Sequence, residues 1–219
     1  MADPKPVEVA LRDTLFGDVP LAQWGAGAGD APPWSHFEAA RRALARIDRA
    51  ATIAALRAVL AIPDAESRQA LQAWHSLRAL GKAPPAGEAK RVLGVVLEVH
   101  IEAGLDVLAA YADHKARFLS HGGSVIVWET PEPAMDERID ALLRAGQTVT
   151  DRIGPWTEPR RGPPPKGDVR INFLTPSGLH FGEGGFDVLD RDPLAHPVIV
   201  SGTMLMQALT ERARTEVNP

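Results

Sequence analysis

The stretch VLGVVLEVHIEAGLDVLAAYADHKARFLSHGGSVIVWE, residues 92–129, is the most informative part of this 219-residue chain. It contains four apolar-rich segments separated by three short turns, which is the pattern of an antiparallel β-meander. In the first segment every odd-numbered residue from 93 to 101 is apolar, whereas the even-numbered residues include a glutamate and a histidine. This alternation indicates a strand that places one face against a core.

The turns of the meander determine which residues stand opposite one another. A three-residue first turn at 102–104 opposes His100 to Asp106, whereas a two-residue turn at 103–104 opposes His100 to Val107. The three-residue turn matches apolar with apolar side chains along both strands, so we expect this register. It also puts Gly104 at the position where a bulge after the turn requires a positive φ.

The two remaining turns extend the register across the sheet. A two-residue turn at residues 113–114 pairs Asp106 with His121, although it contains no glycine. The Gly-Gly sequence at 122–123 is typical of a type I′ turn and predicts the last hairpin. The three turns together predict four strands in one continuous sheet.

In this register His100, Asp106, His121 and Ser124 form a row across the four strands at one end of the sheet, flanked by Glu98 and Glu102. The candidate ligands are His100, Asp106, His121 and Glu98. Imidazole and carboxylate groups are ligands of zinc and other divalent ions, so the row is a candidate site for a metal or small ligand. The alternative is that these residues end their strands in solvent, with His100 and Asp106 as an ordinary cross-strand pair. The sequence has no closely spaced metal-binding motif such as HExxH. The identity of any metal or cofactor is therefore unknown from the sequence.

The N-terminal region, residues 1–35, is rich in proline, glycine and alanine. This composition predicts an extended arm rather than a regular helix or strand. The arm also contains large apolar side chains, among them Trp24, that could anchor it to the body of the protein. An anchored arm and a mobile arm are both compatible with the sequence.

A helical hairpin is predicted for residues 36–81. Ser35 and Glu38 have the spacing of a capping box, and apolar residues recur at helical intervals after them. Pro63 interrupts this pattern, and a second helix runs from about residue 65 until Gly81 ends it.

The region after the meander predicts two helices and a hairpin. Helical periodicity covers residues 134–151 and 198–213, and a β-hairpin with a Pro-Ser-Gly turn covers 169–184. We therefore expect an α+β fold, in which the helical hairpin precedes an antiparallel sheet of about six strands packed with helices. Residues 89–215 are expected to form the α+β domain, as one compact unit with the helical hairpin.

Composition limits the classes of function. The chain contains no cysteine, which fits a reducing cytoplasm, and no run of about 18 apolar residues that could span a membrane. The formal net charge of −4 argues against a general nucleic-acid-binding protein. Its 24 basic residues divide into 19 Arg and 5 Lys, a bias typical of a GC-rich bacterial genome.

Candidate interaction residues lie in two irregular segments. The proline-rich loop 154–168 contains Arg160, Arg161 and Lys166, and the arm contains Trp24. Complete catalytic motifs are lacking: the His-Gly-Gly sequence has no accompanying G-x-S-x-G elbow, and Gly182–Gly185 has no P-loop lysine.

We therefore expect a bacterial cytoplasmic protein that acts as a non-catalytic adaptor or assembly component, through another protein or through self-association. Nucleic acids and membranes are not expected among its partners. The alternative hypothesis is an enzyme that binds a metal or small ligand at the row of histidines and carboxylates.

Overall fold

A six-stranded antiparallel sheet organises the fold, with the strand order β4-β3-β2-β1-β5-β6. The computed structural model describes residues 11–25 and 27–217. The strands are β1 (Gly94–Ile101), β2 (Gly104–Tyr111), β3 (Ala116–Leu119), β4 (Val125–Trp128), β5 (Asp168–Thr175) and β6 (Gly178–Gly185). The prediction of an α+β fold with about six antiparallel strands is confirmed.

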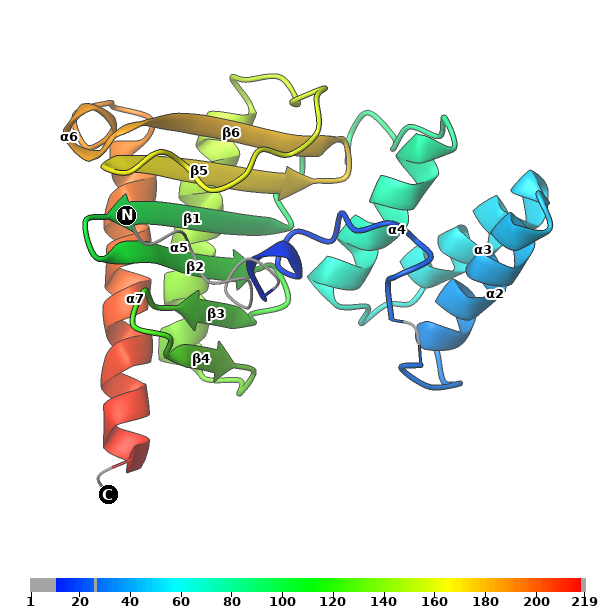
Figure 1. Cartoon of the computed structure of the whole chain (residues 1–219), viewed down its shortest axis with the longest axis horizontal. Coiled ribbons are helices and arrows are strands. Elements are labelled where there is room, and N and C mark those ends of the chain that lie inside the picture. The colour runs from blue at the N-terminus through cyan, green and yellow to red at the C-terminus, as the bar shows by residue number, and fades with distance from the viewer. Residues whose placement is uncertain (1–10, 26, 218–219) are drawn as a thin grey trace.

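Helices pack against one face of the sheet and beside one of its ends (Figure 1). The helices are α2 (Trp34–Ala45), α3 (Arg49–Leu60), α4 (Ser67–Ala79), α5 (Pro133–Thr150), α6 (Phe186–Leu189) and α7 (His196–Val217). Figure 1 shows α5 and α7 behind the sheet, whereas α2, α3 and α4 form a helical part to one side.

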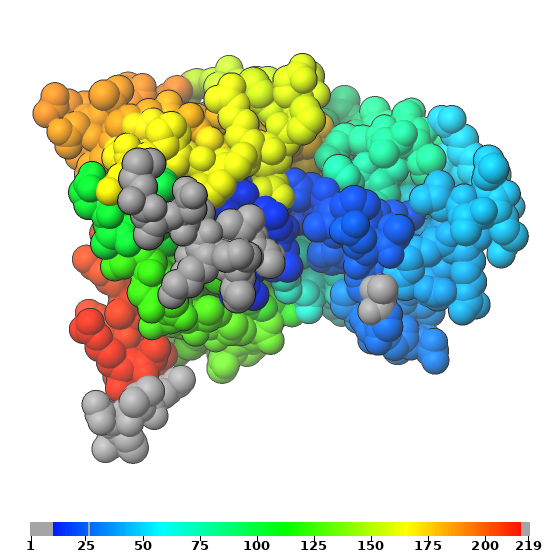
Figure 2. Space-filling view, in the orientation of Figure 1, coloured from blue at the N-terminus to red at the C-terminus, as the bar shows by residue number. Residues whose placement is uncertain are grey.

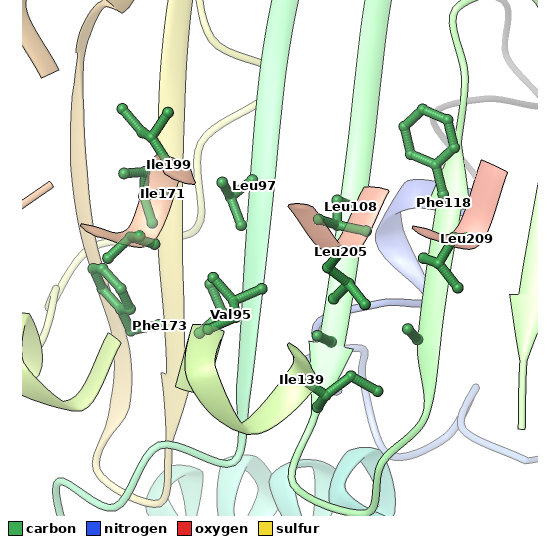
Figure 3. Packing of buried hydrophobic residues seen from close by; sticks show 14 of the residues in the cluster. Val95, Leu97, Leu108, Phe118, Ile139, Ile171, Phe173, Ile199, Leu205 and Leu209 are labelled. Atoms are coloured by element: carbon green, nitrogen blue, oxygen red, sulfur yellow. The ribbon is translucent and has the colours of Figure 1, made fainter. Parts of the chain in front are cut away.

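The main core lies between the sheet and the helices α5 and α7 (Figure 3). Side chains from one face of the strands interdigitate with side chains from the two helices, as burial of the apolar stripe of each element requires. Fully buried members include Val95 and Phe173 from the strands and Ile139, Leu205 and Leu209 from the helices.

The N-terminal arm packs on the opposite face of the sheet. Leu15 and Phe16 are each only 3% exposed and share a cluster with Leu71 of α4 and Tyr111 of β2. The Tyr111 hydroxyl donates a 2.7 Å hydrogen bond to the carbonyl of Leu15, and burial raises the pKa of this phenol. In Figure 2 the blue arm lies between the yellow proline-rich loop and the cyan helical part. These contacts support an anchored arm over residues 11–25; residues 1–10 lie outside the described part.

The helical part contains three helices where the sequence predicted two. The predicted first helix breaks between α2 and α3, where Ile47 has a φ of +59° and the Asp48 side chain accepts a hydrogen bond from the amide of Ala51. An aspartate in this role begins a new helix, and this competes with continuation of the old one.

The predicted capping box is also wrong. Helix α2 begins at Trp34 without a side-chain cap, and Glu38 pairs instead with Arg41 and Arg42. The predicted end of the second helix is confirmed, because Gly81 follows α4 with a φ of +67°.

Candidate functional site

Every turn of the meander differs by one residue from the predicted register. The first turn has two residues (102–103), and the second and third have three each (112–114 and 121–123). His114 takes the left-handed conformation in the second turn, at a φ of +58°, and Gly123 takes it in the third. The sequence had predicted a two-residue second turn, and a non-glycine residue at positive φ is uncommon.

The predicted row of polar residues therefore does not form. His100 stands opposite Leu105 and shares a face with Glu98, whereas Asp106 stands opposite Val99 on the other face. A one-residue change in register moves every side chain of a strand to the opposite face, which is why the prediction failed. In the part of the chain that the structure describes, no group of three or more His, Asp or Glu side chains could hold a metal ion.

One pair from the predicted row remains in contact. The carboxylate of Asp106 accepts hydrogen bonds from the backbone amide of His121, at 2.7 Å, and lies 2.8 Å from its Nδ1. The pair closes the turn between β3 and β4, because Asp106 holds both the backbone and the ring of His121. It lies on the same face as α7, separate from Glu98.

Glu98 is instead the centre of a buried charged network. Its side chain is completely buried, and its Oε1 lies 2.5 Å from Nε of Arg12 in the arm. Its Oε2 accepts a 2.9 Å hydrogen bond from Asn172 and lies 3.8 Å from Arg170. Arg170 also pairs with Glu183 on the neighbouring strand β6. The network joins the arm to the middle of the sheet, and we assign Glu98 a structural role.

The proline-rich loop lies over the same face and is held by polar contacts. His100 Nδ1 lies 2.8 Å from the carbonyl of Pro164, and Arg170 donates to the carbonyl of Gly162. Lys166 pairs with Glu102 at 2.5 Å. The structure thus places His100 and Lys166 in the attachment of the loop to the sheet.

The remaining predicted interaction residues also make contacts within the chain. Arg160 pairs with Asp18 at 2.6 Å and stacks over the ring of Phe16 at 4.0 Å. Arg161 stacks over the ring of Trp156, and its side chain is 51% exposed. The ring of Trp24 packs near those of Trp34 and Phe37, at centroid distances of 6.3 and 6.2 Å.

An apolar groove opens on the α7 side of the sheet, beside the pair of Asp106 and His121. Its lining is mostly aliphatic and aromatic, with Asp106 as its one carboxylate among the described residues. We define the apolar groove by Leu97, Val99, Asp106, Leu108, Phe118, Val169, Phe186, Ile199, Gly202, Thr203 and Met206.

Exposed apolar side chains lie on α6 and α7, the two helices that line this groove. In α6, Phe186 is 45% exposed and Val188 is 69% exposed, and the outer side of α7 exposes Val200 and Met204. Figure 1 places α6 beside the first turns of α7. We call Phe186, Val188, Val200 and Met204 the apolar rim. Sequence reasoning missed this rim, although the alternation of apolar and acidic residues in FDVLDRD (186–192) is a signal for it.

A second, polar cleft lies where the helical part meets the sheet. Its volume is about 180 Å³, and its walls come from the arm, α4, the proline-rich loop and the β5–β6 hairpin. The polar side chains in it include Asp18, His75, Arg78, Arg160 and Ser177. We call this the junction cleft. The four segments that form it are far apart in the sequence, so no local pattern predicts it.

A buried histidine next to this cleft predicts how stability depends on pH. His180 is completely buried, and burial, followed by the nearby charge of Lys90, lowers its pKa. The unfolded chain, in which a histidine titrates near pH 6.5, therefore binds the proton first. We expect this contribution to stability to be complete above about pH 6.5 and to decrease as the pH falls toward the folded pKa.

Denaturant unfolding at about pH 8 and about pH 5.5 measures this effect. We expect a smaller loss of stability on acidification in His180→Gln than in the unchanged chain. Thr150→Ala is the control, because it removes a buried hydroxyl that donates to the carbonyl of Gly146 but removes no titratable group. Equal pH dependence in all three proteins would contradict a neutral buried His180.

Comparisons of the chain with protein-family models, with curated proteins and with solved structures found no significant match. Over residues 11–25 and 27–217, no helix is both long and apolar enough to cross a membrane. The functional conclusion therefore depends on the surface features of this chain.

Proposed function

We propose that this protein is a non-catalytic adaptor or assembly component, and that it binds another protein at the apolar groove. The observation that carries the proposal is the apolar rim: Phe186, which lines the groove, and Val188, Val200 and Met204 are 40–69% exposed on α6 and α7, the two helices that contribute to its wall. Contiguous exposed apolar surface with polar surroundings is typical of protein-binding sites. Isolated exposed apolar residues are common on any protein, but these four lie on two helices, α6 and α7, that both line one groove.

The charges around the groove indicate the kind of segment that would bind. Asp106 lines the groove, and the segment 186–192 contains three aspartates and a single cation, Arg191. A binding segment would place one or two apolar side chains in the groove and a lysine or arginine near Asp106 and Asp187. Such electrostatic complementarity would favour partner selection and fast association.

A different protein fits this surface better than a second copy of the same chain. In a symmetric dimer the same patch meets itself, so the aspartates of one copy would face those of the other. Like charges placed together across an interface are unfavourable. The excess of negative charge therefore favours a basic and apolar partner over self-association at this site.

We place this association in the cytoplasm of a bacterium. The support is compositional: the chain lacks cysteine and has the arginine-rich usage of a GC-rich genome. The alternative of a metal-dependent enzyme loses its geometric basis, because the proposed ligands lie on two faces of the sheet.

A photo-crosslinking amino acid introduced at position 188 tests the site. We expect it to capture a discrete protein that the same amino acid at position 47 does not capture. Ile47 is 90% exposed and lies in the turn between α2 and α3, two helices at the far end of the molecule from α6 (Figure 1). The captured protein, once purified, should bind the unmodified chain directly.

Substitutions then measure the contribution of the rim. Phe186→Ser or Met204→Ser should each weaken binding about tenfold or more, because a buried apolar side chain contributes about 1.5–3 kcal/mol. Ile47→Ser should leave the affinity unchanged, and added salt should weaken binding. Equal effects of the rim and Ile47 substitutions, or capture of a second copy alone, would contradict the proposal.

A further inference from the structure

The junction cleft contains an arginine that has no acidic partner among the described residues. Arg78 lies on α4, and its Nη1 donates a 2.6 Å hydrogen bond to the carbonyl of Pro176 in the β5–β6 turn. The ion pairs formed within residues 11–25 and 27–217 do not include Arg78. Burial lowers the pKa of this guanidinium, and the nearby charge of Asp18 opposes that effect. Its positive charge is therefore partly desolvated without direct compensation.

The other charges in the cleft are already paired or exposed. Asp18 binds the guanidinium of Arg160 at 2.6 and 3.2 Å, and Asp13 binds it at 3.0 Å. Glu158 lies on the exposed part of the loop. Arg160 is thus held by two carboxylates, and Arg78 is the cation in the wall of the cleft that makes no direct ion pair among the described residues.

The groups around Arg78 suit a ligand with a polar head and an apolar body. Burial and the charge of Arg78 lower the pKa of His75, one turn earlier on α4, which favours its neutral form. A neutral imidazole and the hydroxyl of Ser177 can each donate a hydrogen bond. The rings of Phe16 and Trp156, with several leucines, supply apolar wall.

We propose that the junction cleft binds a small organic carboxylate, with Arg78 as the anchor of its carboxylate group. The free N–H groups of a guanidinium match the two oxygens of a carboxylate. A single cation without a direct ion pair favours a monoanion, because the second negative charge of a phosphate dianion would lie near Asp18 without a counter-charge. A volume of about 180 Å³ is below that of pockets for drug-sized ligands, so the ligand is small.

Benzoate is a suitable probe because it joins a carboxylate to an aromatic ring, and benzamide is its neutral counterpart. In a titration of the full chain followed by NMR, we expect benzoate to shift the indole N–H of Trp156 and the amide of Gly178 in a saturable way. The indole N–H of Trp24, which packs in the helical part, should not move. Benzamide and inorganic phosphate should bind at least tenfold more weakly than benzoate.

Arg78→Leu should weaken benzoate binding at least tenfold. Arg49→Leu is the matched control, because Arg49 also donates to a backbone carbonyl, that of Leu80, but does not line the cleft. The control should keep the affinity of the unchanged chain. Arg78→Lys provides a second variant that keeps the charge without the planar fork, and it should bind with an intermediate affinity.

Three results would overturn the proposal: no saturable shift at Trp156 up to about 20 mM benzoate, where even millimolar affinity would be visible; equal binding of benzamide; or equal effects of the two leucine variants. The Trp156 titration uses the unchanged chain, so it remains decisive if a variant fails to fold. Because the cleft is separate from the apolar groove, failure here leaves the proposed protein-binding site intact.

Discussion

Glu98→Gln is expected to lower the free energy of unfolding by about 3–5 kcal/mol, because it removes the buried counter-charge of Arg12. Glu98 is completely buried and lies 2.5 Å from Arg12, whereas Arg170, at 3.8 Å, also has Glu183 as a partner. A glutamine has nearly the same shape but cannot balance the guanidinium of Arg12. Since a protein of this kind is stable by only about 5–15 kcal/mol, the loss is a large part of the total. Urea unfolding followed by circular dichroism measures it.

The control for this prediction lies on the same segment of chain. Glu102 ends the first hairpin and pairs with Lys166 at 2.5 Å, but its side chain is 89% exposed. Glu102→Gln should therefore change stability by less than about 1 kcal/mol. Similar costs for the two substitutions would mean that the charge of Glu98 does not stabilise the native structure.

A double variant separates the charge from the packing. Arg12→Leu combined with Glu98→Leu removes both members of the closest ion pair at once. Arg170 keeps Glu183 as its partner, and Asn172 still donates to the carbonyl of Val96. Replacing a whole buried pair with apolar groups is often neutral. We expect the double variant to be more stable than Glu98→Gln.

Phe173→Ala is expected to destabilise the protein by about 3–5 kcal/mol, since it opens a cavity in the main core. Phe173 is 1% exposed and packs between β5 and α5 (Figure 3). Gly146 of α5 lies directly above it: a Cβ at position 146 would stand 3.0 Å from Phe173 and 2.9 Å from Val95. The absence of a side chain at Gly146 therefore permits the close approach of α5 to the sheet.

This contact predicts that the two positions are energetically coupled. Gly146→Ala alone should lower the free energy of unfolding by about 1–3 kcal/mol through overpacking. The higher helix propensity of alanine should offset about 1 kcal/mol of this loss. In the Phe173→Ala background the new methyl group enters the vacated space, so its cost should fall by about 1 kcal/mol or more.

Gly202→Ala on α7 is the control for this cycle, because its Cβ would meet Leu97 at 2.9 Å and not Phe173. Its cost should add to that of Phe173→Ala within about 0.5 kcal/mol. Additive costs at Gly146 and Phe173 would contradict the packing described here. Unfolding free energies of the six proteins (the unchanged chain, the three single variants and the two double variants) provide the measurement.

Local sequence patterns were sufficient for most of the secondary structure. The alternation in residues 93–101 predicted β1, and the helical periodicity of 134–151 predicted α5 to within one residue at each end. The break at Asp48 was missed, because an aspartate is compatible both with a helix interior and with the first residue of a new helix. The hydrogen bond from the backbone amide of Ala51 to the side chain of Asp48 favours the new helix.

The candidate sites were much less accessible to prediction. The contact between Asp106 and His121 was anticipated, but in a wrong register and as part of a row that does not form. The partner of Glu98, Arg12, lies 86 residues earlier in the chain, in a segment without a periodic pattern. Arg78 gained significance only when the β5–β6 turn was placed against α4.

The amino-acid sequence alone is sufficient for the type and order of the strands and of most helices, because these follow from periodicity and turn residues within short windows. The register of the strands, and the face of the sheet on which each side chain lies, depend on the whole fold. A one-residue shift exchanges the two faces of a strand at little local cost, and the choice is made by what each face then contacts. Here α5 and α7 cover the face of Val95, and the arm supplies Arg12 to the face of Glu98. These distant contacts separate Glu98 from Asp106 and place the two proposed sites.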